Sequence, residues 1–208
     1  QLLSSGIAFL INSTLARYAE NSLMADRAVG AYGIINSAAL VGFMFMLGIA
    51  QGMQPIVGYN YGARAMDRVR QAFKICSSTN FGIGAFVTIV AVVAPGLIAS
   101  LFTSSPEMIE ASAHALRLCL YGFAFVGFQV TATQFFQSIG FGGKALLLSL
   151  SRQILFLLPA LFLFPLLWGS TGVWLAMPFS DIAAGVLGMI LMYYQFKIFD
   201  RKFGPEGL

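Results

Sequence analysis

Long apolar runs separated by short polar breaks cover most of the chain. A helix needs about 20 apolar residues to cross the hydrocarbon core of a bilayer, and each run meets or approaches that length. The breaks carry Gly, Pro, Asn and Ser, which indicates that one helix ends and another begins there. The pattern therefore predicts six membrane-spanning helices, over residues 2–18, 28–59, 72–102, 109–139, 145–167 and 172–199.

We expect these helices to form one all-α bundle over residues 1–208, because no linker or internal repeat interrupts the runs. Several runs are longer than a straight crossing requires, so tilted helices are expected. The chain begins with Gln1 and no positively charged leader precedes the first run, so we expect the natural N-terminus to lie upstream.

Composition places the chain in the membrane class. Hydrophobic residues make up 58% of the sequence and charged residues only 10%, whereas a soluble domain carries roughly 25% charged residues. The net charge of +4 does not indicate nucleic-acid binding, because most basic residues lie at the ends of apolar runs. The sequence has no phosphate loop, HExxH, GxSxG or Cys/His cluster, so we expect neither an enzyme nor a metal or organic cofactor.

The distribution of basic residues predicts the orientation in the membrane. If the connection over residues 62–72 is cytoplasmic, that side collects Arg64, Arg68, Arg70, Lys74, Lys144, Arg152, Lys197, Arg201 and Lys202. The opposite side keeps Arg17, Arg27 and Arg117. Basic residues are enriched in cytoplasmic loops, so this bias predicts six crossings with both chain ends in the cytoplasm.

Asp181 is the one acid deep inside a predicted span, and Pro178 precedes it. Ionisable groups inside a bilayer are costly, so they are functional candidates by default. A proline frees a backbone carbonyl and loosens the helix, which can admit water or an ion. Asp181 is therefore a candidate to carry a proton or bind a sodium ion or organic cation. The alternative is that it caps freed backbone amides or pairs with an Arg or Gln of a neighbouring helix.

A polar stripe runs along the fourth predicted helix, where Gln129, Thr133 and Gln137 recur every four residues and so share one face. Phenylalanines surround the stripe, which fits the wall of a wet, aromatic substrate cavity. Hydrogen bonds between helices, each worth about 0.6 kcal/mol, explain it equally well. Asn36 in the second span has the same two interpretations.

The end of the second span interrupts its apolar run with amides, a proline and glycines, in GIAQGMQPIVGYNYGARAMDRVRQAF over residues 48–73. Glycines let neighbouring backbones approach, a proline breaks the hydrogen-bond ladder, and amides can satisfy the groups it frees. Such a corner can be a cytoplasmic gate or hinge, or a static helix end. The candidate residues are Gln51, Gln54, Pro55, Gly58 and Asn60.

This segment closely resembles the G-x-x-Q-G-x-Q-P-x-x-G-x-N-x-G-A segment of multidrug and toxic compound extrusion (MATE) transporters. The matching positions are Gly48, Gln51, Gly52, Gln54, Pro55, Gly58, Asn60, Gly62 and Ala63. The last predicted helix, AMPFSDIAAGVLGMILMYY, is similar to that of the bacterial branch that includes the MepA-type pumps. The resemblance spans essentially the whole chain.

The resemblance implies twelve helices in two pseudo-symmetric six-helix lobes that export drugs and organic cations against proton or sodium entry, in a bacterial inner membrane. This chain would be the C-terminal lobe, with membrane lipid and an N-terminal lobe as its partners. Some members place acids in the seventh and tenth helices as a cation site. Here those helices carry Asn12, Ser13 and neutral Gln and Thr, so coupling would rest on Asp181 or on an acid of the other lobe.

Two other functions stay open at this point. One is a flippase for a lipid-linked oligosaccharide, since relatives by fold move such substrates. Basic residues inside the spans would favour it, whereas Arg117 and Arg152 are expected near helix ends. The other is a membrane scaffold subunit that transports nothing, in which Asp181 and the polar stripe only hold helices together.

Overall fold

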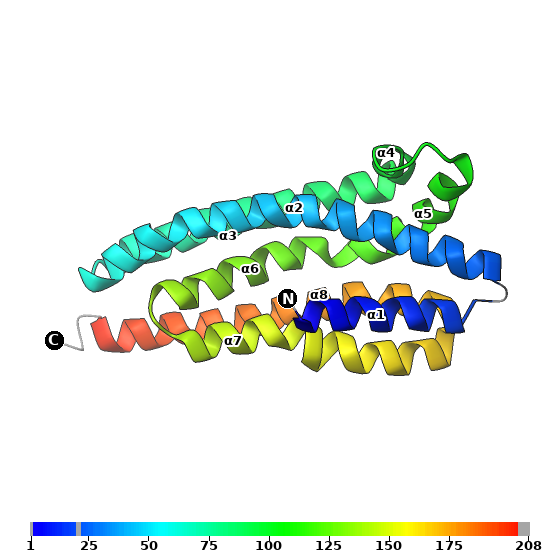
Figure 1. The fold of residues 1–208 in the computed structure, drawn as a ribbon. Coiled ribbons are helices and arrows are strands. Elements are labelled where there is room, and N and C mark those ends of the chain that lie inside the picture. Colours follow the sequence, from blue (N-terminus) through cyan, green and yellow to red (C-terminus); the bar gives the residue numbers. More distant parts are fainter. Residues whose placement is uncertain (1, 20–21, 204–208) are drawn as a thin grey trace.

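The structure is a computed structural model that describes residues 2–19 and 22–203. Every regular element in these two ranges is a helix, which confirms the all-α prediction (Figure 1). The elements are α1 (Leu2–Arg17), α2 (Ser22–Gly62), α3 (Met66–Val93), α4 (Pro95–Ser100), α5 (Pro106–Cys119), the 3₁₀ turn η1 (Leu120–Gly122), α6 (Phe123–Ser138), α7 (Gly142–Leu150), the π-helix η2 (Ser151–Leu157) and α8 (Leu158–Phe203).

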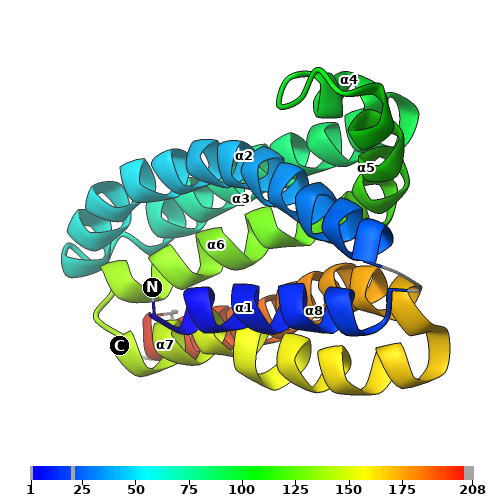
Figure 2. The same ribbon diagram turned by 45° about the vertical axis from the view of Figure 1, so that its right-hand side comes forward.

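Helices α2 and α3 form a long hairpin that lies side by side with α6 in both views (Figures 1 and 2). The turn between them contains Arg64 at a φ of 58°, and the Ala65 amide donates to the Asn60 carbonyl across it. Helix α2 continues through Pro55 without a break. The turn of the hairpin therefore lies at the polar corner of the sequence.

Small residues bring α3 and α6 into close contact. A Cβ atom built on Gly84 would lie 2.6 Å from the Ala124 Cα, and one on Gly127 would lie 2.4 Å from the Asn80 carbonyl oxygen. The buried Asn80 amide then donates to the Thr131 hydroxyl at 2.9 Å. Small residues that let backbones approach, with polar side chains bonding across the interface, are the usual means of helix association in membranes.

Helix α8 contains a reversal of the chain at Gly169, whose φ of 57° and ψ of −138° are not helical. The segments on either side run antiparallel, because Lys144 donates to Gln195 at 2.7 Å and the Phe164 ring contacts that of Phe179 at 5.2 Å. Figure 1 shows this fold-back where the yellow segment turns into the orange one. The boundary between the two last expected spans thus lies inside α8.

Four helical stretches of the described residues are long and apolar enough to span a membrane: Ser22–Gly62, Met66–Val93, Pro106–Ser138 and Gly142–Phe203. The last includes the fold-back, so it holds the two crossings expected over residues 145–167 and 172–199. Helix α1, with 16 residues, falls on the first expected span. The stretches thus follow the apolar runs of the sequence.

The helix expected over residues 72–102 is wrong at both ends. Helix α3 begins earlier, at Met66, and ends at Val93; Pro95 then starts the short α4. Proline restricts the residue before it to extended backbone, and Ala94 has a φ of −134° and a ψ of 56°. The break between α3 and α4 follows from this local rule; the prediction missed it because the residues on both sides of Pro95 are apolar.

Candidate functional site

A cavity of about 620 Å³ opens between α1, α2, α6 and the antiparallel hairpin formed by α7, η2 and α8. Its walls are mostly apolar, with Ile7 and Ile11 from α1 and Phe43 and Leu47 from α2. The structure brings five of the predicted site residues to this one cavity: Asn36, Gln129, Thr133, Gln137 and Asp181. They come from three helices that are far apart in sequence.

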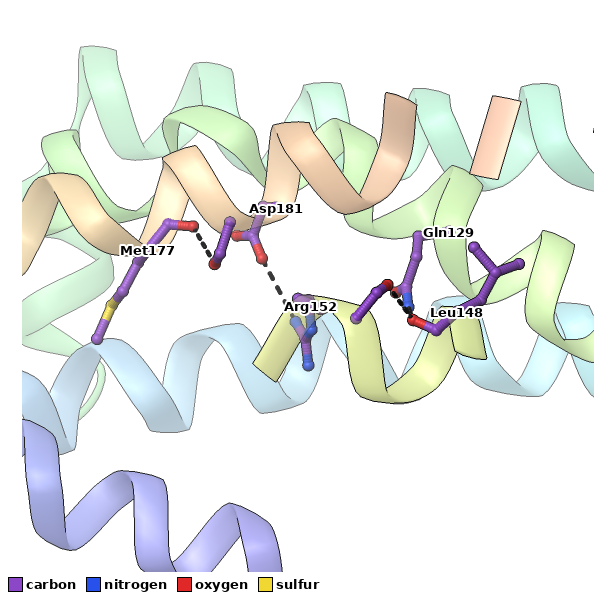
Figure 3. Close-up of polar contacts among 7 residues, drawn as sticks. Gln129, Leu148, Arg152, Met177 and Asp181 are labelled. Atoms are coloured by element: carbon purple, nitrogen blue, oxygen red, sulfur yellow. Dashed lines mark hydrogen bonds and ion pairs between the residues drawn. The ribbon is translucent and has the colours of Figure 1, made fainter. Parts of the chain in front are cut away.

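An ion pair lies at the centre of the polar wall. The Arg152 Nη1 and Asp181 Oδ1 atoms are 3.5 Å apart, and Figure 3 shows the two side chains pointing toward each other from η2 and α8. Of the described residues that line the cavity, these two are the charged ones. Their side chains retain 29% and 12% of their exposure, so the pair is shielded but still reachable from the cavity.

This pairing corrects the expectation for Arg152, which the sequence placed near a helix end among the basic residues of the cytoplasmic side. The structure places it on the π-helical turn η2, inside the hairpin and facing Asp181. A π-helix adds a residue to the turn and is frequent at functional sites. Asp181 therefore has the Arg partner that the sequence analysis left open as its alternative.

Backbone contacts fix the position of Asp181 on α8. Pro178 has no N–H, so the carbonyl four residues earlier, that of Trp174, loses its helical donor; the Cys119 thiol donates to it at 3.7 Å. A Cβ on Gly122 of η1 would lie 2.8 Å from the Pro178 carbonyl oxygen and 3.2 Å from the Asp181 Cβ. Only a glycine allows η1 to approach α8 this closely beside the acid.

The polar stripe of α6 is partly used for structure. The Gln129 Nε2 donates to the Leu148 carbonyl at 2.8 Å and so ties α6 to α7 (Figure 3). The Thr133 hydroxyl donates to the Gln129 carbonyl of its own helix at 2.9 Å. Gln137 and Asn36 are more exposed, at the open side of the cavity. The exposed pair is thus better placed to meet a solute than the buried pair.

An amide cluster joins α2 to α6 at the rim of the same cavity. The Gln54 Nε2 donates to the Gln134 Oε1 and, at 3.4 Å, to the Gln137 Oε1. We call these three residues the amide clasp. Gln134 lies off the four-residue stripe, so the spacing gave no reason to select it; only the position of α2 reveals its role.

The other residues of the predicted gate do not gather at one point. A Cβ on Gly58 would lie 3.4 Å from the Ser138 carbonyl oxygen of α6. Gln51 and Pro55 are exposed. Asn60 donates to the Ile56 carbonyl at 2.8 Å and faces a separate groove between α2 and α3. A hinge at Pro55 stays a prediction.

No three His, Cys, Asp or Glu side chains meet as a metal site within the described ranges. Asp181 is the carboxylate available to a cation in the cavity, and the Ser180 hydroxyl, which donates to the Met177 carbonyl at 2.7 Å, lies next to it. The chemistry of this set suits one monovalent ion or proton, or an organic cation, in competition with Arg152.

The chain is similar in sequence to curated multidrug export proteins. The chain is 25% identical over 186 residues to the multidrug export protein MepA of Staphylococcus haemolyticus (strain JCSC1435), with 88% of this chain and 39% of MepA covered. It is 24% identical over 196 residues to MepA of Staphylococcus aureus (strain NCTC 8325 / PS 47), with the same coverage. The chain thus spans about two fifths of the length of these curated relatives.

Solved structures share the fold. An outward-facing multidrug resistance MATE family transporter of the MOP superfamily superimposes with a TM-score of 0.83 at 24% identity, over 97% of this chain and 44% of that one. The inward-facing conformation gives 0.84 at 23% identity, over 97% and 46%. The bent form of VcmN from Vibrio cholerae gives 0.83 at 20% identity, over 96% and 44%.

The family model named MatE matches residues 1–163, which reach from α1 into the first part of α8. This match includes the polar corner of α2, the stripe of α6 and Arg152. Together with the relatives and the shared fold, it shows that the chain belongs to the MatE family.

Proposed function

We propose that this chain is one lobe of an ion-coupled efflux transporter that exports amphipathic, cationic compounds by rocking against a second six-helix lobe. The observation that carries the proposal is the Asp181 carboxylate in an open, mainly apolar cavity with an arginine as its partner. Apolar and aromatic walls accept many amphipathic molecules, and aromatic faces also attract cations. The substrate is moved, not chemically altered.

The distance within the ion pair suggests how ions and substrate exchange. Charge-assisted hydrogen bonds are typically 2.7–2.9 Å long, whereas Arg152 Nη1 and Asp181 Oδ1 are 3.5 Å apart. This contact is loose enough for a third group to compete for the carboxylate. A proton or sodium ion that binds Asp181 would displace a cationic substrate, and Arg152 would neutralise the acid while the cavity is empty.

Movement of the lobe as a rigid body is the motion that this proposal requires. The lobe superimposes about equally well on an outward-facing and an inward-facing MATE transporter, with TM-scores of 0.83 and 0.84. Alternating access in many transporters is a rocking of one bundle against another around a central site.

The proposed orientation places the turn between α2 and α3 in the cytoplasm of a bacterial cell, with both chain ends on that side. Arg64, Arg68 and Lys74 at this turn and the basic end of α8, with Arg201 and Lys202, support it. Arg152 no longer counts toward this bias, because it lies inside the hairpin. In this arrangement the chain is the C-terminal lobe, and its cavity faces the other lobe.

Ethidium efflux from energised cells tests the proposal, with the transporter that contains this chain and its Asp181→Asn variant. Asp200→Asn is the matched control, since Asp200 lies on the same helix but pairs with Arg70 at an exposed site. We expect Asp181→Asn to lose efflux with normal membrane insertion and Asp200→Asn to keep it. Collapsing the proton and sodium gradients separately would name the coupling ion. Equal efflux from both variants would contradict a transport role for Asp181.

A lipid-linked oligosaccharide flippase is the second candidate, because a basic residue inside the cavity was the feature that favoured it and Arg152 is such a residue. The adjacent Asp181 neutralises it, which makes an anionic headgroup the weaker choice. Arg152→Gln separates the two functions: it would impair a flippase, whereas a cation exporter would retain ethidium binding. A scaffold that transports nothing would tolerate apolar replacement of both residues without a change in drug sensitivity.

A further inference from the structure

A second cavity, of about 470 Å³, lies in a groove between α2 and α3 next to the turn that joins them. Leu47 lines the candidate substrate cavity, whereas Ile49 and Ile56 line this groove, at about 180–200° around α2 from Leu47. Helices α4 and α5 lie over the other end of α2 and α3 in both views, and no described element covers the groove end (Figures 1 and 2). The groove therefore faces away from the substrate cavity, toward lipid.

The groove combines apolar walls with a cationic mouth. Ile56 and Ile75 are 53% and 58% exposed along it. Arg68 and Gln71 lie at the end near the turn. Within the described ranges Arg68 makes no ion pair, in contrast to Arg70, which is paired with Asp200. An unpaired cation above an apolar channel suits an amphipathic ligand with an anionic head.

The length of the groove matches one leaflet of a bilayer. It runs from Asn60 and Arg68 at the turn to Ile49 and Thr79, about 11 residues along each helix, or about 17 Å at 1.5 Å per residue. Half of a 30 Å hydrocarbon core is about 15 Å. The mouth is therefore at headgroup level when the walls span the acyl region of the adjacent leaflet.

We propose that this groove binds a phospholipid with an anionic headgroup, whose phosphate contacts Arg68 and Gln71 and whose acyl chain lies along Ile49, Ile56 and Ile75. Gly52 leaves the floor open, since a Cβ there would meet no atom within 4 Å. A basic residue near the membrane surface favours an anionic lipid about fivefold. The lipid would hold the two arms of the hairpin together on the side of α2 opposite the amide clasp.

Native mass spectrometry of the purified transporter that contains this chain, in nonionic detergent, tests this site, with dioleoylphosphatidylglycerol and dioleoylphosphatidylcholine as probes. Arg68→Gln removes the charge at the mouth; Lys74→Gln is its control, because Lys74 is an exposed base of α3 that does not line the groove. Gly52→Phe fills the groove. Its control is Gly33→Phe, another exposed glycine of α2 with open space around it.

We expect Arg68→Gln to lower phosphatidylglycerol retention about fivefold while Lys74→Gln retains it, and Gly52→Phe to lower retention of both lipids while Gly33→Phe does not. Equal retention by the Arg68 and Lys74 variants would overturn the assignment of the headgroup. Unchanged lipid binding by Gly52→Phe would show that the lipid does not lie in this groove. Each variant's unfolding temperature is measured alongside, and the two pairs of variants test the proposal independently of one another.

Discussion

The close approach of α3 and α6 predicts that adding one methyl group has opposite effects on stability at two glycines of α3. Gly84 and Gly82 are two residues apart on α3. A Cβ on Gly84 would lie 2.6 Å from the Ala124 Cα and 2.7 Å from the Phe123 carbonyl oxygen, whereas one on Gly82 would meet nothing within 4 Å. Because the atoms contacted at Gly84 belong to backbone, no side chain can move aside.

The size of the effect follows from these distances. Carbon atoms pack best at about 3.5–4.0 Å, so α3 and α6 must separate by about 1 Å. Overpacking of this kind costs about 1–3 kcal/mol, and the nearby 2.9 Å bond from Asn80 to Thr131, worth about 0.6 kcal/mol, would be stretched. Replacing Gly by Ala in a helix returns about 0.8–1.0 kcal/mol. Gly84→Ala should therefore destabilise the fold by a net of about 0.5–2.5 kcal/mol, and Gly82→Ala should stabilise it slightly.

Thermal unfolding in detergent, followed with a thiol-reactive fluorophore, measures this difference directly. Cys76 and Cys119 are free and buried, so they react only when the bundle opens. For a chain of this length, 1 kcal/mol shifts the midpoint by about 2–4 °C. We expect the midpoint of Gly84→Ala to be lower than that of Gly82→Ala by several degrees. Equal midpoints would refute the argument that this glycine is required for the contact between α3 and α6.

Three further predictions concern the cavity. Gln54→Leu removes the amide clasp and should lower stability by about 1 kcal/mol, whereas the exposed Gln51→Leu should not; unfolding midpoints compare them, and equal midpoints would count against the clasp. Arg152→Gln leaves Asp181 without its counterion, so the unfolding midpoint of this variant should fall below that of the double variant Arg152→Gln/Asp181→Asn. The loss of stability should stay under the roughly 3–5 kcal/mol measured for fully buried pairs. A lower midpoint for the double variant would contradict a stabilising pair. Gly122→Ala places a methyl group against α8 beside the acid, so ethidium efflux should fall at normal expression; unchanged efflux would show that this contact does not position the site.

The sequence indicated several of the polar residues that line the candidate cavity. Asp181 stood out because an acid is rare in an apolar run, and Gln129, Thr133 and Gln137 because a period of four places them on one helix face. Both signals are local, and both sets of residues do line the cavity. Whether they act in transport remains a prediction that the efflux experiment tests.

The partners of these residues could not be predicted in the same way. The sequence predicts Arg152 near a helix end, because it does not show that η2 is π-helical or that the chain reverses at Gly169. Gln134 lies off the stripe, so its spacing gives no signal, yet it bonds to Gln54, 80 residues away. Nothing in the sequence distinguishes Gly84 from the other glycines, because the backbone atoms that a side chain there would contact belong to α6.

There is a physical reason why the sequence predicts the helices but not the contacts between them. The bilayer acts on each apolar run separately, so length and composition alone determined that the chain is helical and where most helices lie. An ion pair such as Arg152–Asp181 depends on the register of two antiparallel segments, and an interface such as that of Gly84 depends on how closely two backbones approach. Register and approach arise only when the helices pack, so they were decided by the tertiary structure.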